Sequence, residues 1–165
     1  MESDIIENTL LLKEKRLKEI LTPRSVVFAL NKDLTLKEAV KNQDIDKFSR
    51  IPIYNENIDS VVGVVLTKTL LREVIDGREL KLEDIMTEVY KLNENITISK
   101  AIKYFIKSKT HMIIITDSYD QTEGVVTLED CVETVLGFEI MDESDTTEDM
   151  RKLATQQMKT KRSNF

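Results

Sequence analysis

The chain of 165 residues contains an internal repeat, and this repeat limits the possible folds more than any other feature. Three short strings recur in the same order, namely Leu34–Val40 as Ile96–Ile102, Val62–Val65 as Glu123–Val126, and Ile20–Thr22 as Ile85–Thr87. The first pair is offset by 62 residues and the second by 61, so the two offsets agree within one residue. A repeat at a fixed period indicates copies of one supersecondary unit. The sequence therefore predicts two units that fold alike.

Each copy predicts the element order β-α-β-β-α. Extended segments are expected at 26–28, 51–54 and 61–66 in the first copy, and at 89–90, 112–116 and 124–126 in the second. In the second copy, Ile98, Ala101, Ile102, Phe105 and Ile106 fall on one helical face. In the first copy, Thr35 and Glu38 have the spacing of a capping box. A second helix closes each copy, at 70–75 and 128–136, before Gly77 and Gly137.

The predicted fold class is α/β (α+β), with two units packed as a pseudo-twofold pair. A small sheet with two helices on one face leaves its other face under-covered, and a second copy can bury that face. The expected boundaries are 21–80 and 81–140 for the two units. Residues 1–20 are expected to form an amphipathic N-terminal linker helix, and residues 141–165 an acidic and then basic tail.

Composition excludes several classes of protein. The net charge of −6 and the pI of about 5.0 argue against nucleic-acid binding, which needs a basic face. Cys131 is the single cysteine, so no internal disulfide can form and a reducing compartment is expected. His111 is the only histidine, which removes most hydrolytic triads and zinc sites. No apolar run is long enough to cross a bilayer, so the chain as given is expected to be soluble.

Several strings resemble the CBS-domain family, and within it the cytosolic module of hemolysin-like, CorC-type proteins. The strings are Ile20–Arg24, Phe48–Tyr54, Gly124–Asp130 and Val135–Ile140, followed by Asp142-Glu143. The resemblance covers residues 5–150 and implies a tandem CBS pair, also called a Bateman module. It also implies an attached membrane domain in magnesium and cobalt transport, a place on the cytoplasmic side of the membrane, and an adenine nucleotide (ATP or AMP) as regulatory ligand.

Thr127 and Asp130 are the first candidate site residues. A carboxylate at the start of a helix can accept the ribose hydroxyls, and the helix N-terminus favours phosphate. The resemblance implies that these two residues hold the ribose and phosphate. The same spacing also makes a capping pair that stabilises the helix without any ligand. The corresponding residues of the first copy, Leu66 and Thr69, lack the carboxylate, so one good site per chain is expected.

The remaining site residues are expected in the first copy, because the resemblance implies head-to-head packing of the two units. They are Thr22, Phe48, Ser49, Arg50, Ile51 and Pro52. Ile51 and Pro52 would form apolar walls of the adenine slot, Phe48 would stack on the base, and Arg50 would pair with phosphate or form a surface salt bridge. His111 is placed at the position equivalent to Arg50, where a structural role is expected.

No catalytic residue and no protein metal site are predicted. The carboxylates Glu139, Asp142, Glu143 and Asp145 are interpreted as a solvated acidic run, and Mg²⁺ would arrive with ATP. Exposed apolar faces at Leu70, Val74, Val132 and Val135 would support a homodimer. A structural dimerisation module with a degenerate nucleotide site is the alternative function. A nucleotide hydrolase is disfavoured because the chain has no glycine-rich phosphate loop and no histidine or cysteine constellation.

Overall fold

The computed structural model describes residues 2–137, which form two compact units. The middle unit comprises Phe28–Val89, and the terminal unit comprises residues 2–27 together with residues 90–137. The predicted acidic and basic tail at 141–165, with the carboxylates Glu139, Asp142, Glu143 and Asp145, lies outside the described residues. No helix among the residues described is both long enough and apolar enough to span a bilayer.

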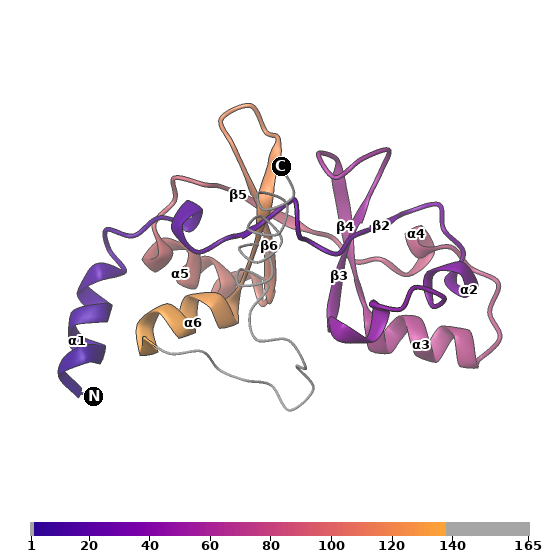
Figure 1. Ribbon diagram of the computed structural model, residues 1–165, viewed down its shortest axis with the longest axis horizontal. Helices are drawn as coiled ribbons and strands as arrows, with labels where there is room; N and C mark the ends of the chain where they lie inside the picture. The colour runs from indigo at the N-terminus through magenta and orange to yellow at the C-terminus, as the bar shows by residue number, and fades with distance from the viewer. Residues whose placement is uncertain (1, 138–165) are drawn as a thin grey trace, which may run out of the picture. The chain divides into compact units, whose positions relative to one another are not determined.

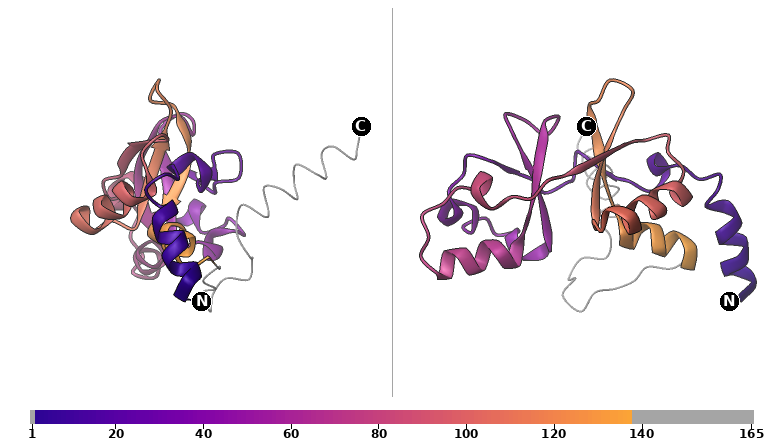
Figure 2. Two further views of the ribbon diagram at one scale, coloured as in Figure 1. Left: turned by 90° about the vertical axis from the view of Figure 1, so that its left-hand side faces the viewer. Right: turned by 180° about the vertical axis from the view of Figure 1, so that it is seen from behind.

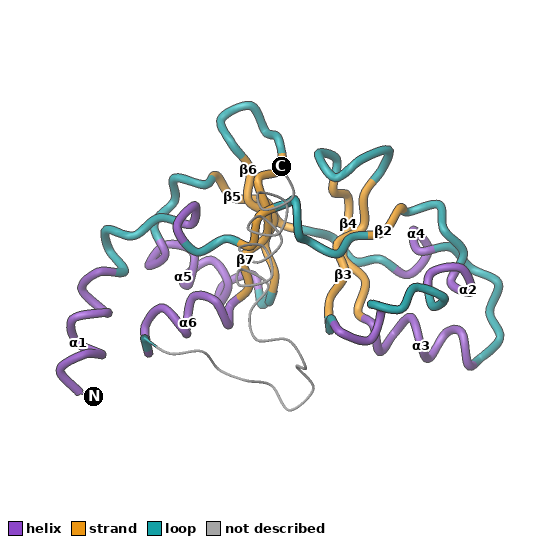
Figure 3. Tube along the Cα trace, in the orientation of Figure 1, coloured by secondary structure: helices purple, strands orange, loops and turns teal. Residues whose placement is uncertain are grey.

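The middle unit is a three-stranded sheet with helices on one face (Figures 1 and 3). Its elements are β2 (Leu30–Asn31), α2 (Leu36–Ala39), the 3-10 helix Ile45–Lys47, β3 (Arg50–Tyr54), β4 (Val61–Leu66), α3 (Thr67–Ile75) and α4 (Leu82–Ile85). Strand β3 lies in the centre, parallel to β2 and antiparallel to β4. Ile51, Ile53 and Val65 point from the sheet into a core shared with Leu36 and Leu70 of the helices.

The terminal unit has a four-stranded sheet of order β1-β7-β6-β5. Its elements are α1 (Glu2–Leu11), the 3-10 helix Leu17–Glu19, β1 (Thr22–Pro23), β5 (Tyr90–Asn93), α5 (Ile98–Ser108), β6 (Met112–Thr116), β7 (Thr122–Thr127) and α6 (Leu128–Leu136). Helices α5 and α6 pack together, and α1 lies alongside α6 (Figure 2). Ile113, Ile115 and Val126 point into a core with Phe105 and Cys131.

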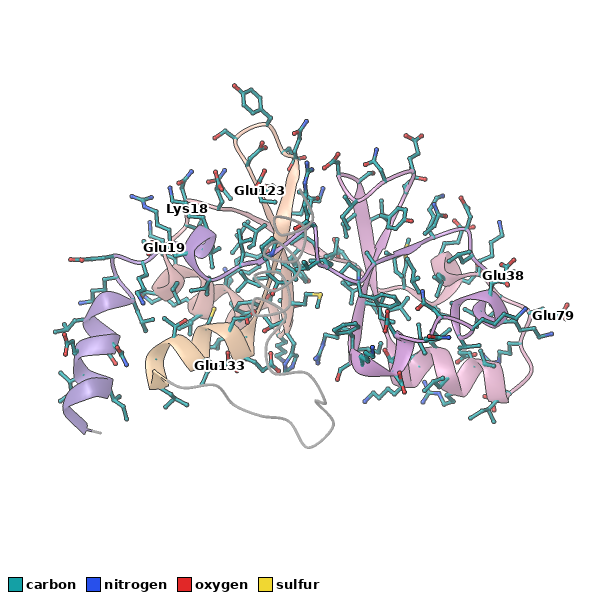
Figure 4. All side chains as sticks on the ribbon, in the orientation of Figure 1. Lys18, Glu19, Glu38, Glu79, Glu123 and Glu133 are labelled. Atoms are coloured by element: carbon teal, nitrogen blue, oxygen red, sulfur yellow. The ribbon has the colours of Figure 1, made fainter. Side chains whose placement is uncertain are left out.

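The predicted α/β class and the β-α-β-β-α order are confirmed in both units. The middle unit runs β2-α2-β3-β4-α3, and the terminal unit runs β5-α5-β6-β7-α6. The capping box of Thr35 and Glu38 is also confirmed, since each side chain bonds the other residue's backbone N–H. Hydrogen bonds from Thr35 lower the pKa of the Glu38 carboxyl, which lies at the start of α2 (Figure 4). Gly137 ends α6 with φ of 76°, as a helix C-cap requires.

The leading segment of each repeat joins the sheet that is built from the other repeat. Thr22 lies in β1 and pairs with Val125 of β7, whereas Thr87 forms an isolated bridge with Val64 of β4. The compact units therefore differ from the boundaries expected at 21–80 and 81–140, because residues 21–27 belong to the terminal unit and residues 81–89 to the middle unit. The extended segment expected at 26–28 is also misplaced, since the strand next to β3 is Leu30–Asn31.

The N-terminal helix is shorter than the predicted 1–20. Helix α1 ends at Leu11, and its Ile6 and Leu10 side chains are exposed. The later apolar residues of the pattern, Leu17 and Ile20, are buried in the core of the terminal unit. The backbone N–H of Leu17 donates to Ile96 O over 2.9 Å, and this tertiary bond replaces a bond that a continuous helix would make.

The expected exposed dimer face is wrong in detail. Leu70 is fully buried in the core of the middle unit, and Val74 and Val135 pack against the cores of their units. On α3, the exposed apolar side chains are instead Leu71 and Ile75. The register of the amphipathic face is thus shifted by one residue from the expected one, and the homodimer remains a prediction without this support.

Cys131 lies in the core of the terminal unit, and this environment changes the pKa of its thiol. Burial raises the pKa of the thiol from 9.0 to about 12, and the Asp130 and Glu129 carboxylates add to the increase. Since the unfolded thiol ionises at the lower value, the stability contributed by this neutral thiol is complete below pH 9.0 and is lost as the pH rises towards about 12.

Native Cys131 is therefore expected to resist a disulfide-exchange reagent at about pH 8, because the thiolate is the reactive form. The same reagent should modify it at once in urea. Absorbance of the released thiol checks both results, and a rapid reaction of the native protein would contradict the buried position.

Candidate functional site

The eight predicted site residues fall into two groups, one in each unit. Thr22, Thr127 and Asp130 belong to the terminal unit, and the segment Phe48–Pro52 belongs to the middle unit. Each group has its own geometry and is positioned by its own sheet. In the terminal unit the group lies at the β7–α6 junction and on the neighbouring strand β1, and in the middle unit it runs from just before β3 into the first half of that strand.

Thr127 and Asp130 form a complete capping box at the start of α6. The Asp130 Oδ2 atom accepts hydrogen bonds from Thr127 N over 2.7 Å and from Thr127 Oγ1 over 2.8 Å. In return, the Asp130 N–H donates to Thr127 Oγ1 over 3.2 Å. Both side chains are half-buried. The cap therefore holds a carboxylate in a fixed position beside a helix N-terminus, where the helix dipole favours anions.

Thr22 lies next to this cap because β1 pairs with β7. Thr22 is opposite Val125, which is two residues before Thr127 on the same strand. Side chains alternate along a strand and paired residues point to the same side, so Thr22, Val125 and Thr127 share one face of the sheet. Val126 points the other way, into the core formed with α5 and α6. The structure thus brings three of the predicted residues to one place.

The start of α3 shows why the first repeat lacks this arrangement. Leu66 occupies the N-cap and makes no side-chain capping bond, as its sequence predicts. The next residue, Thr67, is buried and serves a different purpose. Its Oγ1 donates to the carbonyl oxygen of Phe48, and its N–H donates to Ser49 O over 3.1 Å. Helix α3 thereby fixes the backbone of the predicted base-binding segment.

Phe48 is held from a second side by Phe28. The two rings stack with centroids 5.4 Å apart and an interplanar angle of 23°. Both rings are half-buried at the margin of the core of the middle unit. Since an aromatic pair of this kind is stabilising and orients both rings, Phe28 positions the side chain that was predicted to stack on a base.

The side chains of β3 alternate between the core and the opposite face. Ile51 is fully buried in the core of the middle unit, so its side chain cannot form the wall of a base slot that was expected from the sequence. Arg50 and Pro52 point to the face opposite that core, by the alternation of a strand. Ser49 is exposed. Within this segment, Phe48 and Arg50 are half-buried, whereas Ile51 and Pro52 are both buried.

The expected equivalence of His111 with Arg50 is wrong by one residue. In the strand registers, Arg50 pairs with Leu66, and Met112 pairs with Thr127, the counterpart of Leu66. His111 therefore corresponds to Ser49, and its carbonyl accepts from Leu128 N as that of Ser49 accepts from Thr67 N. The hairpin of the second repeat is one residue shorter, which explains the change of offset from 62 to 61.

The described part of the chain contains no cluster of side chains that could bind a metal ion. Within residues 2–137, no three side chains of histidine, cysteine, aspartate or glutamate lie close enough together to hold a metal ion. Within the terminal unit, the start of α6 is suited to binding through one carboxylate, hydroxyls and backbone N–H groups.

Thr67, Phe28 and Gly124 are positioning residues that the sequence did not single out for function. Thr67 directly follows Leu66, the position equivalent to Thr127. From the sequence its hydroxyl could be expected near the start of a helix, but its hydrogen bond to the Phe48 carbonyl could not be predicted. Phe28 lies far from Phe48 in sequence, so no periodicity links the two rings. Gly124 was visible as part of the repeat, although the close approach of the Thr22 carbonyl to its Cα was not.

Replacing Thr67 by valine is expected to destabilise the middle unit by about 1–3 kcal/mol, because the part-buried Phe48 carbonyl would lose the hydrogen bond from the buried Thr67 hydroxyl. Thr67→Ser keeps the hydroxyl and is the matched control. Urea unfolding followed by circular dichroism measures both variants. Equal stability of Thr67→Val and the wild type would mean that the hydroxyl does not hold this segment.

Known proteins match the chain in sequence and in structure. The profile of the family described as "CBS domain" matches residues 82–137. The magnesium and cobalt efflux protein CorC of Escherichia coli is 28% identical over 148 residues, which are 89% of this chain and 50% of that protein. Across the curated relatives first matched, the chain spans between 23% and 53% of their length.

Solved structures give the same result. The CBS domain of a bacterial CNNM/CorC family Mg²⁺ transporter superposes with a TM-score of 0.78 and 34% identity, covering 86% of both chains. The structure of that domain in complex with ATP has a TM-score of 0.76 and 34% identity, covering 84% of this chain and 99% of that one. The fold and the paired repeats are thus those of CBS domains, and the chain belongs to the CBS modules of the CNNM/CorC family.

Proposed function

We propose that this chain is a regulatory CBS module that binds an adenine nucleotide, ATP or AMP, and controls an attached membrane domain in divalent-cation transport. The observation that carries the proposal is the arrangement at the start of α6. There, the Thr127–Asp130 capping box fixes a carboxylate, and β1 brings Thr22 alongside on the same sheet. A buried hydroxyl, a fixed carboxylate and a helix N-terminus suit a ribose phosphate better than they suit an apolar ligand.

Each predicted residue has a role in this proposal. Asp130 accepts the ribose hydroxyls, since the cap holds its carboxylate in a fixed position at the start of α6. Thr22, Thr127 and the first N–H groups of α6 contact the ribose and phosphates. Phe48, oriented by Phe28, and Pro52 contact the base, with Ser49 and the Ile51 backbone beside them. Arg50 pairs with phosphate, and Mg²⁺ enters with ATP through its phosphate oxygens.

The relatives support the choice of ligand and of parent protein. ATP is bound by the CBS domain of the bacterial CNNM/CorC family transporter, and magnesium and cobalt efflux is the activity named for the Escherichia coli relative. We therefore place this module beside a membrane domain, on the cytoplasmic side, with magnesium or cobalt as the transported ion. A homodimer, as first expected, is part of the proposal.

The module acts by binding and not by catalysis. A ligand shifts a conformational equilibrium by the difference between its affinities for the two states. A nucleotide that contacts residues of both repeats can have different affinities for two arrangements of these repeats, and the attached domain receives the shift. The hydroxyl–carboxylate pair of the proposed site, Thr127 and Asp130, is engaged in the cap of α6, so hydrolysis of the nucleotide is not proposed.

Isothermal titration calorimetry with ATP, ADP and AMP, each with and without Mg²⁺, tests the proposal. One nucleotide per chain is expected, because only the second repeat has the Thr-x-x-Asp cap. The alternative, a structural dimerisation module with a degenerate site, has the absent cap at Leu66 in its favour. Absence of heat with all three nucleotides, together with a dimeric mass in light scattering, would favour that alternative.

A further inference from the structure

Helix α5 carries a basic face that the proposed nucleotide site does not use. Its exposed charged side chains are Lys100, Lys103 and Lys107, spaced at i, i+3 and i+7, followed by Lys109 at its C-cap. No aspartate or glutamate occurs in residues 98–110. Such a run of one sign is unusual in a chain whose net charge is −6. We define these four lysines as the α5 basic face.

These lysines have no partner among residues 2–137. Within residues 2–137, none of the four has a side-chain hydrogen bond or an ion pair. By contrast, Lys32, Lys37 and Lys47 of the middle unit each pair with a carboxylate. The opposite side of α5, with Ile98, Ala101 and Phe105, is fully buried and fixes the orientation of the helix. The α5 basic face is thus directed outward by the core.

An apolar residue and a second basic segment extend this surface. Ile106 is 69% exposed and lies on α5 between Lys103 and Lys107 in sequence. The backbone of Leu12 and Lys15 accepts hydrogen bonds from Ser99 N and Ile98 N, which places the segment with Lys13 and Lys15 at the start of α5. Figure 3 shows α5 and α6 on one face of the sheet of the terminal unit.

We propose that the α5 basic face binds the anionic headgroups of a lipid bilayer. Basic residues near a membrane are attracted by the negative surface potential of the leaflet, and an exposed apolar side chain among them can enter the headgroup region. All four basic residues are lysines. Arginine would be expected for bidentate recognition of carboxylates on a protein partner, whereas lysine suits a diffuse attraction. Nucleic acid is a poorer fit because the face has no arginine and no aromatic side chain.

The inference rests on the proposed function, which puts the module beside a membrane domain. Attachment to that domain keeps the module close to the bilayer, so a weak attraction is enough to hold it in contact. Contact with the bilayer would then affect the conformation of the module independently of nucleotide binding.

Co-sedimentation of the full chain with vesicles tests this proposal. The wild type is expected to bind phosphatidylcholine vesicles that contain phosphatidylserine at about one third of the lipid, but not vesicles of phosphatidylcholine alone. Binding should weaken as salt is raised from about 0.1 M to about 1 M, because the screening length falls from about 10 Å to about 3 Å.

The variant Lys100→Glu/Lys103→Glu/Lys107→Glu is expected to lose about tenfold or more of the vesicle affinity. The matched control, Lys37→Glu/Lys41→Glu/Lys81→Glu, changes the net charge by the same amount but in the middle unit. Its vesicle affinity should stay close to that of the wild type. Circular dichroism checks that both variants are folded. Titration with ATP should be unchanged in the α5 variant, so failure of this proposal and failure of nucleotide binding are distinguishable.

Three results would overturn the proposal. The first is absence of binding to phosphatidylserine vesicles by the wild type. The second is an equal loss of affinity in the control variant. The third is carbodiimide cross-linking of the α5 lysines to the carboxylates of residues 139–149 in the full chain, which would assign the face to that acidic segment instead.

Discussion

The variant Gly124→Ala is expected to lose about 3 kcal/mol of unfolding free energy, the upper end of the usual range for overpacking. A Cβ atom at this position would clash with Thr22 O and would lie 2.9 Å from the Leu21 side chain. The first contact is with backbone, so relief requires β1 to move away from β7. The same movement displaces Thr22 from the start of α6, and nucleotide binding should weaken with stability.

Gly63→Ala is the matched control because Gly63 has the same place in the other repeat. There, a Cβ atom would meet Met86 Sδ at 2.7 Å and Met86 Cγ at 2.9 Å, with Thr87 O at 3.0 Å. A methionine side chain has three rotatable bonds and can move, so a loss of about 1 kcal/mol is expected. Urea unfolding followed by circular dichroism measures both, since the chain has no tryptophan. Equal losses would contradict the close approach of β1 to Gly124.

These glycines show what the repeat could predict and what it could not. The recurrence of Gly63 as Gly124 was visible in the sequence, together with that of Thr22 as Thr87. Helix caps and the order of elements depend on neighbouring residues, and they were predicted correctly. The pairing of Thr22 with Val125 joins segments far apart in the chain, and no local pattern specifies which sheet receives a leading strand. The domain boundaries were therefore beyond a local prediction.

The errors in side-chain direction have a common cause. Strand β3 is apolar at successive positions, so the sequence does not say which residues face the core, and Ile51 was assigned to the ligand. On α3, the apolar residues 70, 71, 74 and 75 cover a wide arc, and Leu70 lies at its buried centre. The N-terminal helix was extended too far because the apolar spacing continues to Ile20, whereas the Leu17 N–H bonds to Ile96. Tertiary contacts decided each case.

Of the candidate site, the sequence correctly predicted the cap of α6 and its absence at Leu66. A cap was always one of two interpretations of Thr127 and Asp130, and the structure contains it. Whether the same pair also binds a nucleotide requires a measurement that separates the two roles. A charge-removing substitution that keeps the shape of the side chain provides this separation.

Asp130→Asn is expected to abolish the stabilisation of the protein by ATP. If the wild-type site is filled at about 100 times its dissociation constant, the nucleotide adds about 2.7 kcal/mol to the unfolding free energy. Asparagine is close in shape and can still cap the helix, so the ligand-free protein should lose no more than about 0.5–2 kcal/mol. Its neutral amide accepts the ribose hydroxyls poorly, and the shift in Tm with millimolar ATP and magnesium should disappear.

Glu38→Gln is the matched control for the capping role. The Glu38 carboxylate accepts from Thr35 N over 2.9 Å and from Thr35 Oγ1 over 2.7 Å, which reproduces the hydrogen bonds of Asp130 in a cap with no proposed ligand. This variant should have a slightly lower Tm and an unchanged ATP shift. Thermal unfolding of both variants, with and without nucleotide, gives the comparison. If Asp130→Asn keeps the full ATP shift, as Glu38→Gln should, then Asp130 is only a cap and the nucleotide binds elsewhere or through the remaining residues alone.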